Sequence, residues 1–393
     1  MSGGESHVLI AGGGIGGLTA SIALAREGLA AEILERSSFG DETGAGIQLG
    51  PNATRLLASL GVIDAIEPHA FRPEAIVVFD GVSGRKLTAV PLGRSVVARY
   101  GAPYLTLHRA DLHAGLRKVA QDHSTVTLSP GFEAATLEAH AGDVVVRAAD
   151  GRTAEGASLI GADGLWSAIR AHIMPEAELR FTGATAWRAL LPRGGLPAPF
   201  DAPAVGLWLG PGAHLVHYPV RGGAELNVVA VTEGGSQHQG WNRPPDAETL
   251  LASFIRWCKD SKSLLNRASG WRSWSLYRLA NLRQWSGGRV ALLGDAAHPV
   301  LPFLAQGAAL TIEDAVTLAR CMAAEPADPA LAFRRYETIR RPRADRVDRL
   351  SRRYGRLYRL GGPLRLARNL LLERRSEQRA LARLDWLYRR PDD

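Results

Sequence analysis

The spacing of hydrophobic residues at the start of the chain predicts alternating strands and helices. Residues 7–12 form a short apolar run that ends in glycine, and apolar side chains then recur at helical spacing over residues 15–28. Residues 31–35 supply the next short strand. Strand, helix and strand in this order, at these lengths, predict a βαβ unit within a parallel sheet.

The same alternation returns later in the chain, but two long stretches depart from it. Helices and buried strands that continue the first pattern are predicted over residues 51–60, 109–121, 125–128, 143–148, 157–162, 289–294 and 295–323. The departing stretches carry short alternating strands punctuated by Gly and Pro. Those strands are predicted over residues 76–79, 86–90, 185–191, 205–209, 214–218, 225–232 and 272–278, with a helix over 246–258.

This pattern predicts an α/β chain with a discontinuous first domain. A Rossmann-like domain is interrupted by a β-rich domain, and a helical region closes the chain. The predicted boundaries are 1–72, 100–180 and 276–328 for the first domain, 73–99 and 181–275 for the second, and 329–393 for the helices.

Composition fits a soluble enzyme of about two domains. The chain has 393 residues, with 46% hydrophobic and 22% charged residues. We find no apolar run of about 18 residues and no basic, then apolar leader, so we expect a cytoplasmic protein without a membrane span. Cys258 and Cys321 lie far apart, so we expect no metal site, no disulfide framework and no redox dithiol.

The net charge of +8 is concentrated at the C-terminal end. From Arg334 onward the chain has 19 arginines and 8 acidic residues. We expect these arginines to lie on solvated helix faces. No nucleic-acid partner is expected, because the region lacks interleaved aromatic residues and any known nucleic-acid-binding module. Peripheral membrane contact and homodimer formation remain open.

The first glycine-rich motif follows the first predicted strand. Gly12, Gly14 and Gly17 match GxGxxG, where the first glycine allows a tight turn, the second a close approach to a pyrophosphate and the third helix packing. Glu35 ends the next strand, where a carboxylate can bind ribose hydroxyls. A purely structural glycine turn is the alternative, but the flanking strand and carboxylate favour dinucleotide binding.

Two further motifs follow predicted strands and decide which dinucleotide is bound. They are Gly161-Ala162-Asp163-Gly164 and Gly294-Asp295-Ala296-Ala297-His298-Pro299. Asp295 is expected to begin a helix and to bind a second ribose or ribityl hydroxyl, while Asp163 and Gly164 form a polar turn beside the same crevice. Either aspartate alone could simply cap a helix. The three motifs together, in this order, predict one FAD wrapped by the discontinuous domain.

With these motifs the chain resembles the group A flavoprotein aromatic hydroxylases, which share the p-hydroxybenzoate hydroxylase fold. It most resembles the branch that contains salicylate hydroxylase, 3-hydroxybenzoate 6-hydroxylase and 6-hydroxynicotinate 3-monooxygenase. The resemblance extends from Val8 to Tyr388. Further matching segments are Gly46-Ile47-Gln48-Leu49-Gly50-Pro51-Asn52, Leu107-His108-Arg109-Ala110-Asp111-Leu112 and Leu301-Pro302-Phe303-Leu304-Ala305-Gln306-Gly307.

The resemblance implies a set of cofactor contacts. The residues expected to contact FAD are Glu35, Arg36, Arg109 and Asp295, with Gln48 near the isoalloxazine and Asp163 and Gly164 serving both FAD and the pyridine nucleotide. No second GxGxxG motif exists, which fits transient binding of NADH or NADPH. Phe303 stands where the resemblance leads us to expect tyrosine, so the polarity of the substrate pocket departs from the family pattern.

Candidate catalytic residues lie in the segment from Ala213 to Pro219. Alternation places His214 and Tyr218 on one face of a strand and His217 on the other. Taken alone, His214 and Tyr218 could be ordinary polar residues of a half-exposed sheet. The resemblance implies instead that both contact the substrate ring, with Gln306 facing the flavin from the opposite side.

We therefore expect an FAD-dependent monooxygenase that uses NAD(P)H and O₂ to hydroxylate a small phenolic or hydroxy-heteroaromatic acid. The resemblance implies that oxygen transfer proceeds through a C4a-hydroperoxyflavin. Ionising the substrate hydroxyl makes the ring a better nucleophile, so a base near the phenol would accelerate the reaction. Two alternatives stay open: an oxygenase of the same fold with a non-phenolic substrate, such as an epoxidase or a quinolone or antibiotic hydroxylase, and a non-catalytic flavoprotein binding module.

Overall fold

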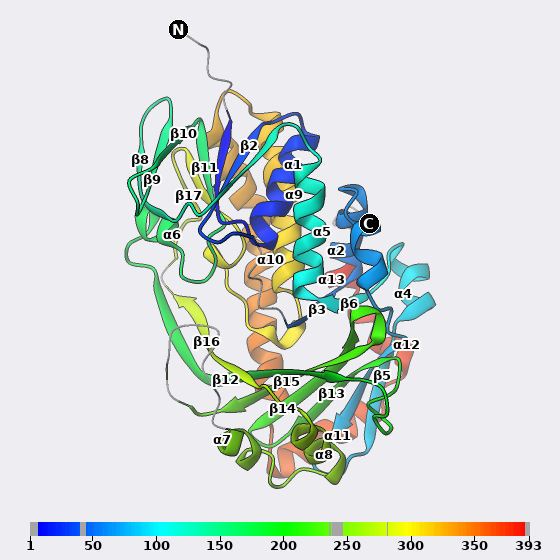
Figure 1. Cartoon of the computed structure of the whole chain (residues 1–393). Helices are drawn as coiled ribbons and strands as arrows, with labels where there is room; N and C mark the ends of the chain where they lie inside the picture. The colour runs from blue at the N-terminus through cyan, green and yellow to red at the C-terminus, as the bar shows by residue number, and fades with distance from the viewer. Residues whose placement is uncertain (1–6, 40–44, 236, 238–246, 281, 390–393) are drawn as a thin grey trace.

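The structure, a computed structural model, describes residues 7–39, 45–235, 237, 247–280 and 282–389. These residues build two large sheets, one in each half of the molecule (Figure 1). Helices α1, α5, α9 and α10 gather around the first sheet, whereas the second lies across the other half with short helices beyond it (Figure 1).

The first sheet has six strands in the order β17-β18-β11-β1-β2-β7 and contains the predicted βαβ unit. All neighbours are parallel except β17 and β18. Its strands are β1 (Val8–Ala11), β2 (Ala31–Glu35), β7 (Val126–Pro130), β11 (Ser158–Gly161), β17 (Ser286–Gly287) and β18 (Val290–Leu292). Its principal helices are α1 (Ile15–Arg26), α5 (Arg109–Gln121) and α9 (Gly307–Ala324).

The second sheet has seven strands in the order β16-β12-β15-β14-β13-β4-β5. Neighbours are antiparallel except β13 and β4, which run parallel. Its strands are β4 (Ala75–Asp80), β5 (Lys86–Pro91), β12 (Glu178–Pro192), β13 (Ala204–Gly210), β14 (Ala213–Val220), β15 (Glu225–Glu233) and β16 (Arg272–Ala280). The two stretches that depart from the alternating pattern thus supply most of one sheet.

Several shorter elements were not predicted, because they are too short to show a clear period. They are β3 (Gly46–Leu49), β6 (Leu105–His108), β8 (Ala134–Ala139), β10 (Thr153–Gly156), α3 (Ile63–Ile66), α4 (Gly93–Tyr100), α6 (Ala168–Ile173) and α8 (Lys259–Arg267). The predicted α2 (Pro51–Ser59) and β9 (Val144–Ala148) are present. The predicted helix over 246–258 is wrong in extent: α7 covers Ala247–Ala252, and residue 246 lies outside the described residues. Trp257 there turns inward and is buried.

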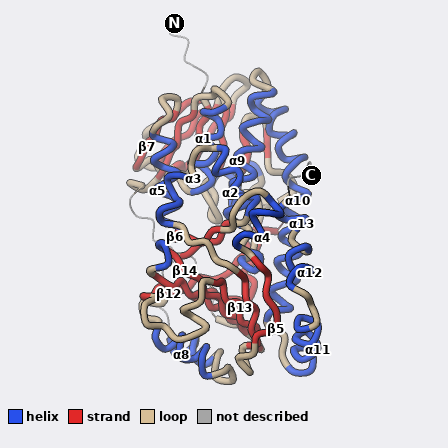
Figure 2. Tube along the Cα trace, turned by 90° about the vertical axis from the view of Figure 1, so that its right-hand side faces the viewer, coloured by secondary structure: helices blue, strands red, loops and turns tan. Residues whose placement is uncertain are grey.

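One long helix joins the two halves of the molecule. α10 (Pro329–Tyr358) begins beside the first sheet and continues past the second, as the turned view in Figure 2 also shows. The chain then ends in α11 (Gly362–Glu373), α12 (Glu377–Ala382) and α13 (Asp385–Tyr388). Tyr388 returns to pack edge-to-face on Tyr100 of α4, with ring centroids 5.4 Å apart.

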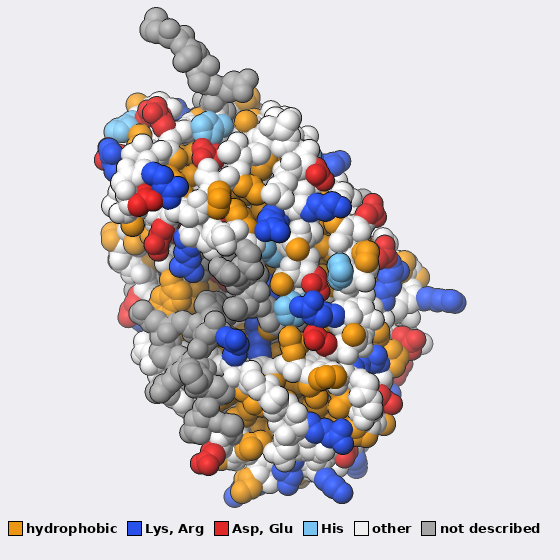
Figure 3. Space-filling model, in the orientation of Figure 1, with side chains coloured by type: hydrophobic (Ala, Val, Ile, Leu, Met, Phe, Trp, Pro, Cys, Tyr) orange, Lys and Arg blue, Asp and Glu red, His pale blue; other side chains and the backbone are white. Residues whose placement is uncertain are grey.

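The C-terminal arginines divide into two groups, only one of which was predicted. Arg340 is buried and bridges Glu313 and Asp314 of α9, and Arg368 is buried near Asp80, so the expectation of solvated faces is wrong for these two. These carboxylates come close to the arginines only in the folded protein, so the sequence pattern does not reveal the pairing. On the face shown in Figure 3, Lys and Arg side chains are interspersed with Asp and Glu. No helix in the described parts of the chain is long and apolar enough to cross a membrane.

Arg349, Arg352, Arg353 and Arg356 of α10 are exposed. Changing all four to glutamine should lower the free energy of unfolding little, because surface charges away from special features typically matter by less than about 0.5 kcal/mol each. Denaturant titration with and without the substitutions measures this. Loss of an affinity for anionic liposomes or nucleic acid after the change would show that the arginines form a binding surface instead.

Candidate functional site

The first motif forms an open cradle at the N-terminus of α1. Gly12 has φ +103°, and a Cβ there would lie 2.5 Å from the carbonyl oxygen of Ala162. A Cβ on Gly17 would collide with the carbonyl oxygen of Gly12. By contrast, a Cβ on Gly14 would meet no protein atom within 4 Å. Two glycines therefore serve the fold, while Gly14 leaves free space where a helix N-terminus favours a phosphate.

Glu35, at the end of β2, is tied to this cradle. One carboxylate oxygen accepts a hydrogen bond from the backbone N–H of Gly13 at 2.6 Å, and the other accepts one from Ser37 at 2.8 Å. A carboxylate has further acceptor capacity for sugar hydroxyls. Arg36 is exposed and has no ion pair within the described part of the chain.

The second and third motifs lie side by side at the ends of β11 and β18. Arg170 joins them, donating to the carbonyl oxygens of Ala296 at 3.0 Å and Leu165 at 2.6 Å. Asp163 accepts from the N–H of Ile169 at 3.1 Å, and its other oxygen is buried with no partner among the described residues. Gly164 has φ +78°, which suits a tight turn.

Asp295 lies in a single 3₁₀ turn, Gly294–Ala296, rather than at the start of an α-helix as predicted. The helix begins only at Gly307, because the intervening segment with Pro299 and Pro302 cannot continue a helix. The Asp295 side chain is exposed at the surface of a crowded part of the site. Desolvation by its protein neighbours raises its pKa, whereas the positive charges of His298, Arg109 and Arg170 act in the opposite direction. Burial lowers the pKa of Arg109, and the charge of Asp295 opposes that shift.

The face of β14 that carries His214 looks toward the loop after the third motif. The His214 ring lies edge-on to Phe303, with centroids 5.3 Å apart, and 5.5 Å from the ring of Tyr358. His214 is 3% exposed, and its Nδ1 has no partner within the described segments. Burial, assisted by the charge of Arg359, lowers the pKa of His214 to about 3, so the imidazole is neutral at physiological pH.

His217 lies on the opposite face, as the alternation predicts. Its ring packs edge-on to Phe200 at 5.0 Å and 6.3 Å from Trp208, within the core on the far side of the sheet. Burial alone lowers the pKa of His217 to about 3. This histidine is remote from Phe303 and from the motifs of the first sheet.

Tyr218 shares the His214 face and lies against β3. Gln48 accepts a hydrogen bond from Tyr104 at 2.8 Å. Burial raises the pKa of Tyr218 to about 12, although Arg188 and Gln48 act in the opposite direction. The phenol therefore stays protonated and can donate a hydrogen bond.

Gln306, at the start of α9, is fixed by a buried polar network that the sequence analysis missed. Asn52 donates to Gln306 at 3.1 Å and to Glu313 at 2.6 Å. Arg340 and Arg343 bind Glu313 in turn, at 2.7 Å and 2.5 Å. The segment containing Asn52 already matched the family, but nothing in the sequence linked it to Gln306.

The network continues to the third motif through His298. Its imidazole pairs with Asp314, which Arg340 also binds at 2.7 Å. Burial alone would raise the pKa of Asp314, but the charges of His298 and Arg340 hold it below its usual value. His298 thus ties the loop of the third motif to α9.

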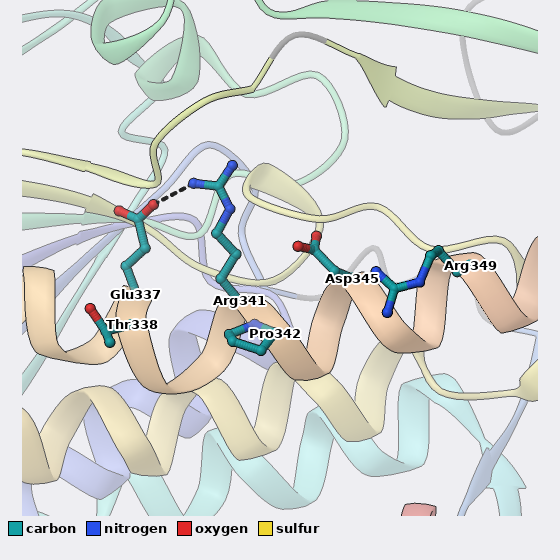
Figure 4. A pocket seen from close by; sticks show the side chains of 6 residues that line it. All are labelled: Glu337, Thr338, Arg341, Pro342, Asp345 and Arg349. Carbon is teal, nitrogen blue, oxygen red and sulfur yellow. Dashed lines mark hydrogen bonds and ion pairs between the residues drawn. The ribbon is translucent and has the colours of Figure 1, made fainter.

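A hollow on α10 lies apart from these residues. Its lining consists of Glu337, Thr338, Arg341, Pro342, Asp345 and Arg349 (Figure 4). Glu337 and Arg341 form an ion pair across it at 2.7 Å. None of the predicted site residues lines it, so we assign it no role. Within the described residues, no three His, Cys, Asp or Glu side chains are grouped as metal ligands would be.

Comparison with known proteins shows the family to which the chain belongs. Residues 5–351 match the FAD binding domain family, and the chain belongs to that family. It is 37% identical over 382 residues to 3-hydroxybenzoate 6-hydroxylase of Polaromonas naphthalenivorans (strain CJ2), covering 97% of this chain and 95% of that protein. It is 39% identical over 387 residues to 3-amino-4-hydroxybenzoate 2-monooxygenase PtnB3 of Streptomyces platensis, covering 97% and 95%.

A solved structure agrees with these sequence relatives. HpxO of Klebsiella pneumoniae, solved with FAD and uric acid, superposes with a TM-score of 0.84 at 26% identity, covering 97% of this chain and 96% of that one. The predicted flavin-hydroxylase fold and the FAD cofactor are thus confirmed, and the protein is an FAD-dependent monooxygenase. The open space at Gly14 and the unpartnered oxygen of Asp163 fit such a cofactor.

Proposed function

We propose that this protein hydroxylates a small phenolic or hydroxy-heteroaromatic acid, using NAD(P)H and O₂. The observation that carries the proposal is the 5.3 Å approach of His214 to Phe303, which joins the second sheet to the loop of the flavin-binding motif. A substrate ring bound beside this contact, on the same face of β14, would meet the neutral imidazole of His214 and the protonated phenol of Tyr218. Relatives named for 3-hydroxybenzoate and 3-amino-4-hydroxybenzoate support an aromatic acid as substrate.

In this proposal each catalytic candidate has a defined task. His214 accepts the hydrogen bond of the substrate hydroxyl and so polarises the O–H bond, because with its pKa lowered to about 3 the imidazole stays neutral and keeps an acceptor nitrogen. Tyr218 donates a hydrogen bond to the substrate, and Gln306 orients it from the α9 side. Bound FAD supplies the redox and oxygen chemistry, and the protein supplies orientation and water exclusion.

The cofactor contacts are proposed residue by residue. Gly12, Gly14 and Gly17 form the pyrophosphate cradle, and Glu35 and Arg36 lie at the end of β2 for the adenosine part. Gln48, Arg109, Asp163, Gly164 and Asp295 are proposed for the remainder of FAD, with Asp163 and Gly164 also serving the nicotinamide nucleotide. The unpartnered oxygen of Asp163 and the facing charges of Arg109 and Asp295 support this assignment.

The domain division is likewise a proposal. The strands of the seven-stranded sheet come almost entirely from residues 73–99 and 181–275, although β12 begins at Glu178 and β16 ends at Ala280. We also propose a cytoplasmic location, where NAD(P)H is available, and a homodimer. The exposed leucines of α11 offer apolar surface for such a dimer, which sedimentation would test.

A substrate panel tests the reaction. Purified holoenzyme is mixed with NADH or NADPH and with hydroxybenzoates, 3-amino-4-hydroxybenzoate and 6-hydroxynicotinate, and both NAD(P)H oxidation and hydroxylated product are measured. We expect at least one phenolic acid to stimulate oxidation and to be converted. Conversion of non-phenolic rings alone would favour the alternative oxygenase. If no aromatic ligand stimulates reduction of the flavin by NAD(P)H, a non-catalytic binding module is favoured.

A further inference from the structure

Arg188 of β12 lies on the same sheet face as the catalytic candidates. In the strand register Arg188 is opposite Val229, and Val229 is opposite Val216. His214 and Tyr218 flank Val216 by two residues on either side, so all three polar side chains share one face. β12 and β14 are separated by one strand, which places their axes about 10 Å apart.

The guanidinium of Arg188 packs on an aromatic ring but has no anionic partner among the described residues. Its Cζ lies 4.0 Å from the centre of the Trp274 ring, within the range of a cation–π contact. Its Nε is buried with no hydrogen-bond partner, and no carboxylate of the described residues pairs with it. Leaving a partly buried cation unpaired is costly, so the site is suited to an anion.

Neighbouring arginines are already engaged. Arg109 faces Asp295, and Arg359, whose charge reaches His214, pairs with Glu233 at 3.5 Å. The positive charge of Arg188 lowers the pKa of Tyr218. The positive charge of Arg109 in turn lowers the pKa of Arg188. Arg188 is therefore near both Tyr218 of β14 and Arg109 at the start of α5, where a bound ring would lie.

We propose that Arg188 binds the carboxylate of the aromatic acid substrate and so selects anionic rings over neutral ones. This inference rests on the proposed function and adds its specificity residue. The planar fork of a guanidinium matches a carboxylate in a two-bond geometry that lysine cannot reproduce. With the carboxylate at Arg188, the hydroxyl end of the ring extends toward His214.

The test measures binding of two probes that lack a hydroxyl, benzoate and benzamide, by perturbation of the flavin absorbance in the holoenzyme. Benzoate should bind wild type more tightly than benzamide. Arg188→Met should weaken benzoate binding by about tenfold or more, as expected for loss of hydrogen bonds to a charged group. Benzamide binding should change by less than about threefold on the same basis, and Arg188→Lys should recover only part of the benzoate affinity.

Arg180→Met is the matched control, because Arg180 lies on the same strand but is solvent-accessible and pairs with Glu178 at 2.9 Å. It should leave both affinities unchanged. Equal weakening of benzoate and benzamide in Arg188→Met, or a wild type that does not prefer benzoate, would overturn the proposal and assign Arg188 a packing role on Trp274. If benzoate binds through Arg188 but no ring is ever hydroxylated, the proposed reaction fails while the anion site stands.

Discussion

Replacing Gly14 with valine should give a folded protein that purifies without its flavin. A Cβ at this position would meet no described protein atom within 4 Å, so we expect the substitution to leave the fold intact. It would fill the space in front of α1 where the pyrophosphate is expected, and a branched side chain there should weaken FAD binding by about 10²-fold, or about 2.8 kcal/mol. Flavin absorbance per polypeptide measures the loss, and circular dichroism checks the fold.

Two companion variants make this result specific. Gly17→Val should instead prevent folding, because its side chain would collide with the backbone of Gly12. Asp295→Ala removes a proposed hydroxyl partner and should also deplete the flavin. Full yellow colour in both Gly14→Val and Asp295→Ala would contradict the proposed cofactor contacts.

Replacing His214 with alanine should slow hydroxylation by about 10²-fold or more, the usual contribution of a positioned proton acceptor. FAD content should stay intact, because His214 lies on β14 and not in a glycine cradle. The defect should shrink as pH rises toward the phenol pKa of about 10, since solution then supplies the phenolate. With its own pKa lowered to about 3, His214 should add no inflection near pH 6.5 to the wild-type profile. Single-turnover product formation across pH 6–10 measures both effects.

His217→Ala is the control for this prediction. The residue is equally buried but packs against Phe200 and Trp208 on the other face of the sheet. Its loss should affect stability more than the rate of hydroxylation. A silent His214→Ala together with a severe His217→Ala would show that the catalytic face of the strand is the opposite one.

Helices and strands with a clear hydrophobic pattern of their own could be predicted from the sequence. β2 spans Ala31–Glu35 and α5 spans Arg109–Gln121, with the bounds predicted from hydrophobic spacing. The glycine motifs could be placed because each follows a buried strand. The position of Asp295 was harder to predict: the conformation of the turn depends on how the segment up to Gln306 packs, and strand spacing says nothing about that.

Contacts between distant segments could not be predicted from the sequence. Arg340 looked like one more surface arginine, because its carboxylate partners on α9 become neighbours only when α10 packs there. Arg188 was placed within a predicted strand, but alternation alone does not tell which face meets the first sheet. The pairing of β12 with β15, and of β15 with β14, decides that point.

The strand order of the six-stranded sheet also bears on how the protein is synthesised. β1 lies between β11 and β2, and β18 joins this sheet only after every strand of the other sheet has been made. Gly12 leaves the ribosome about 280 residues before Asp295, an interval of roughly 15–60 s at ordinary translation rates. Until β18 is made, the edge of β11 with which it pairs stays unpaired, although β1 and β2 already have both of their neighbours. The complete set of proposed FAD ligands therefore becomes available only late in translation, on a nascent chain that has already produced its substrate sheet.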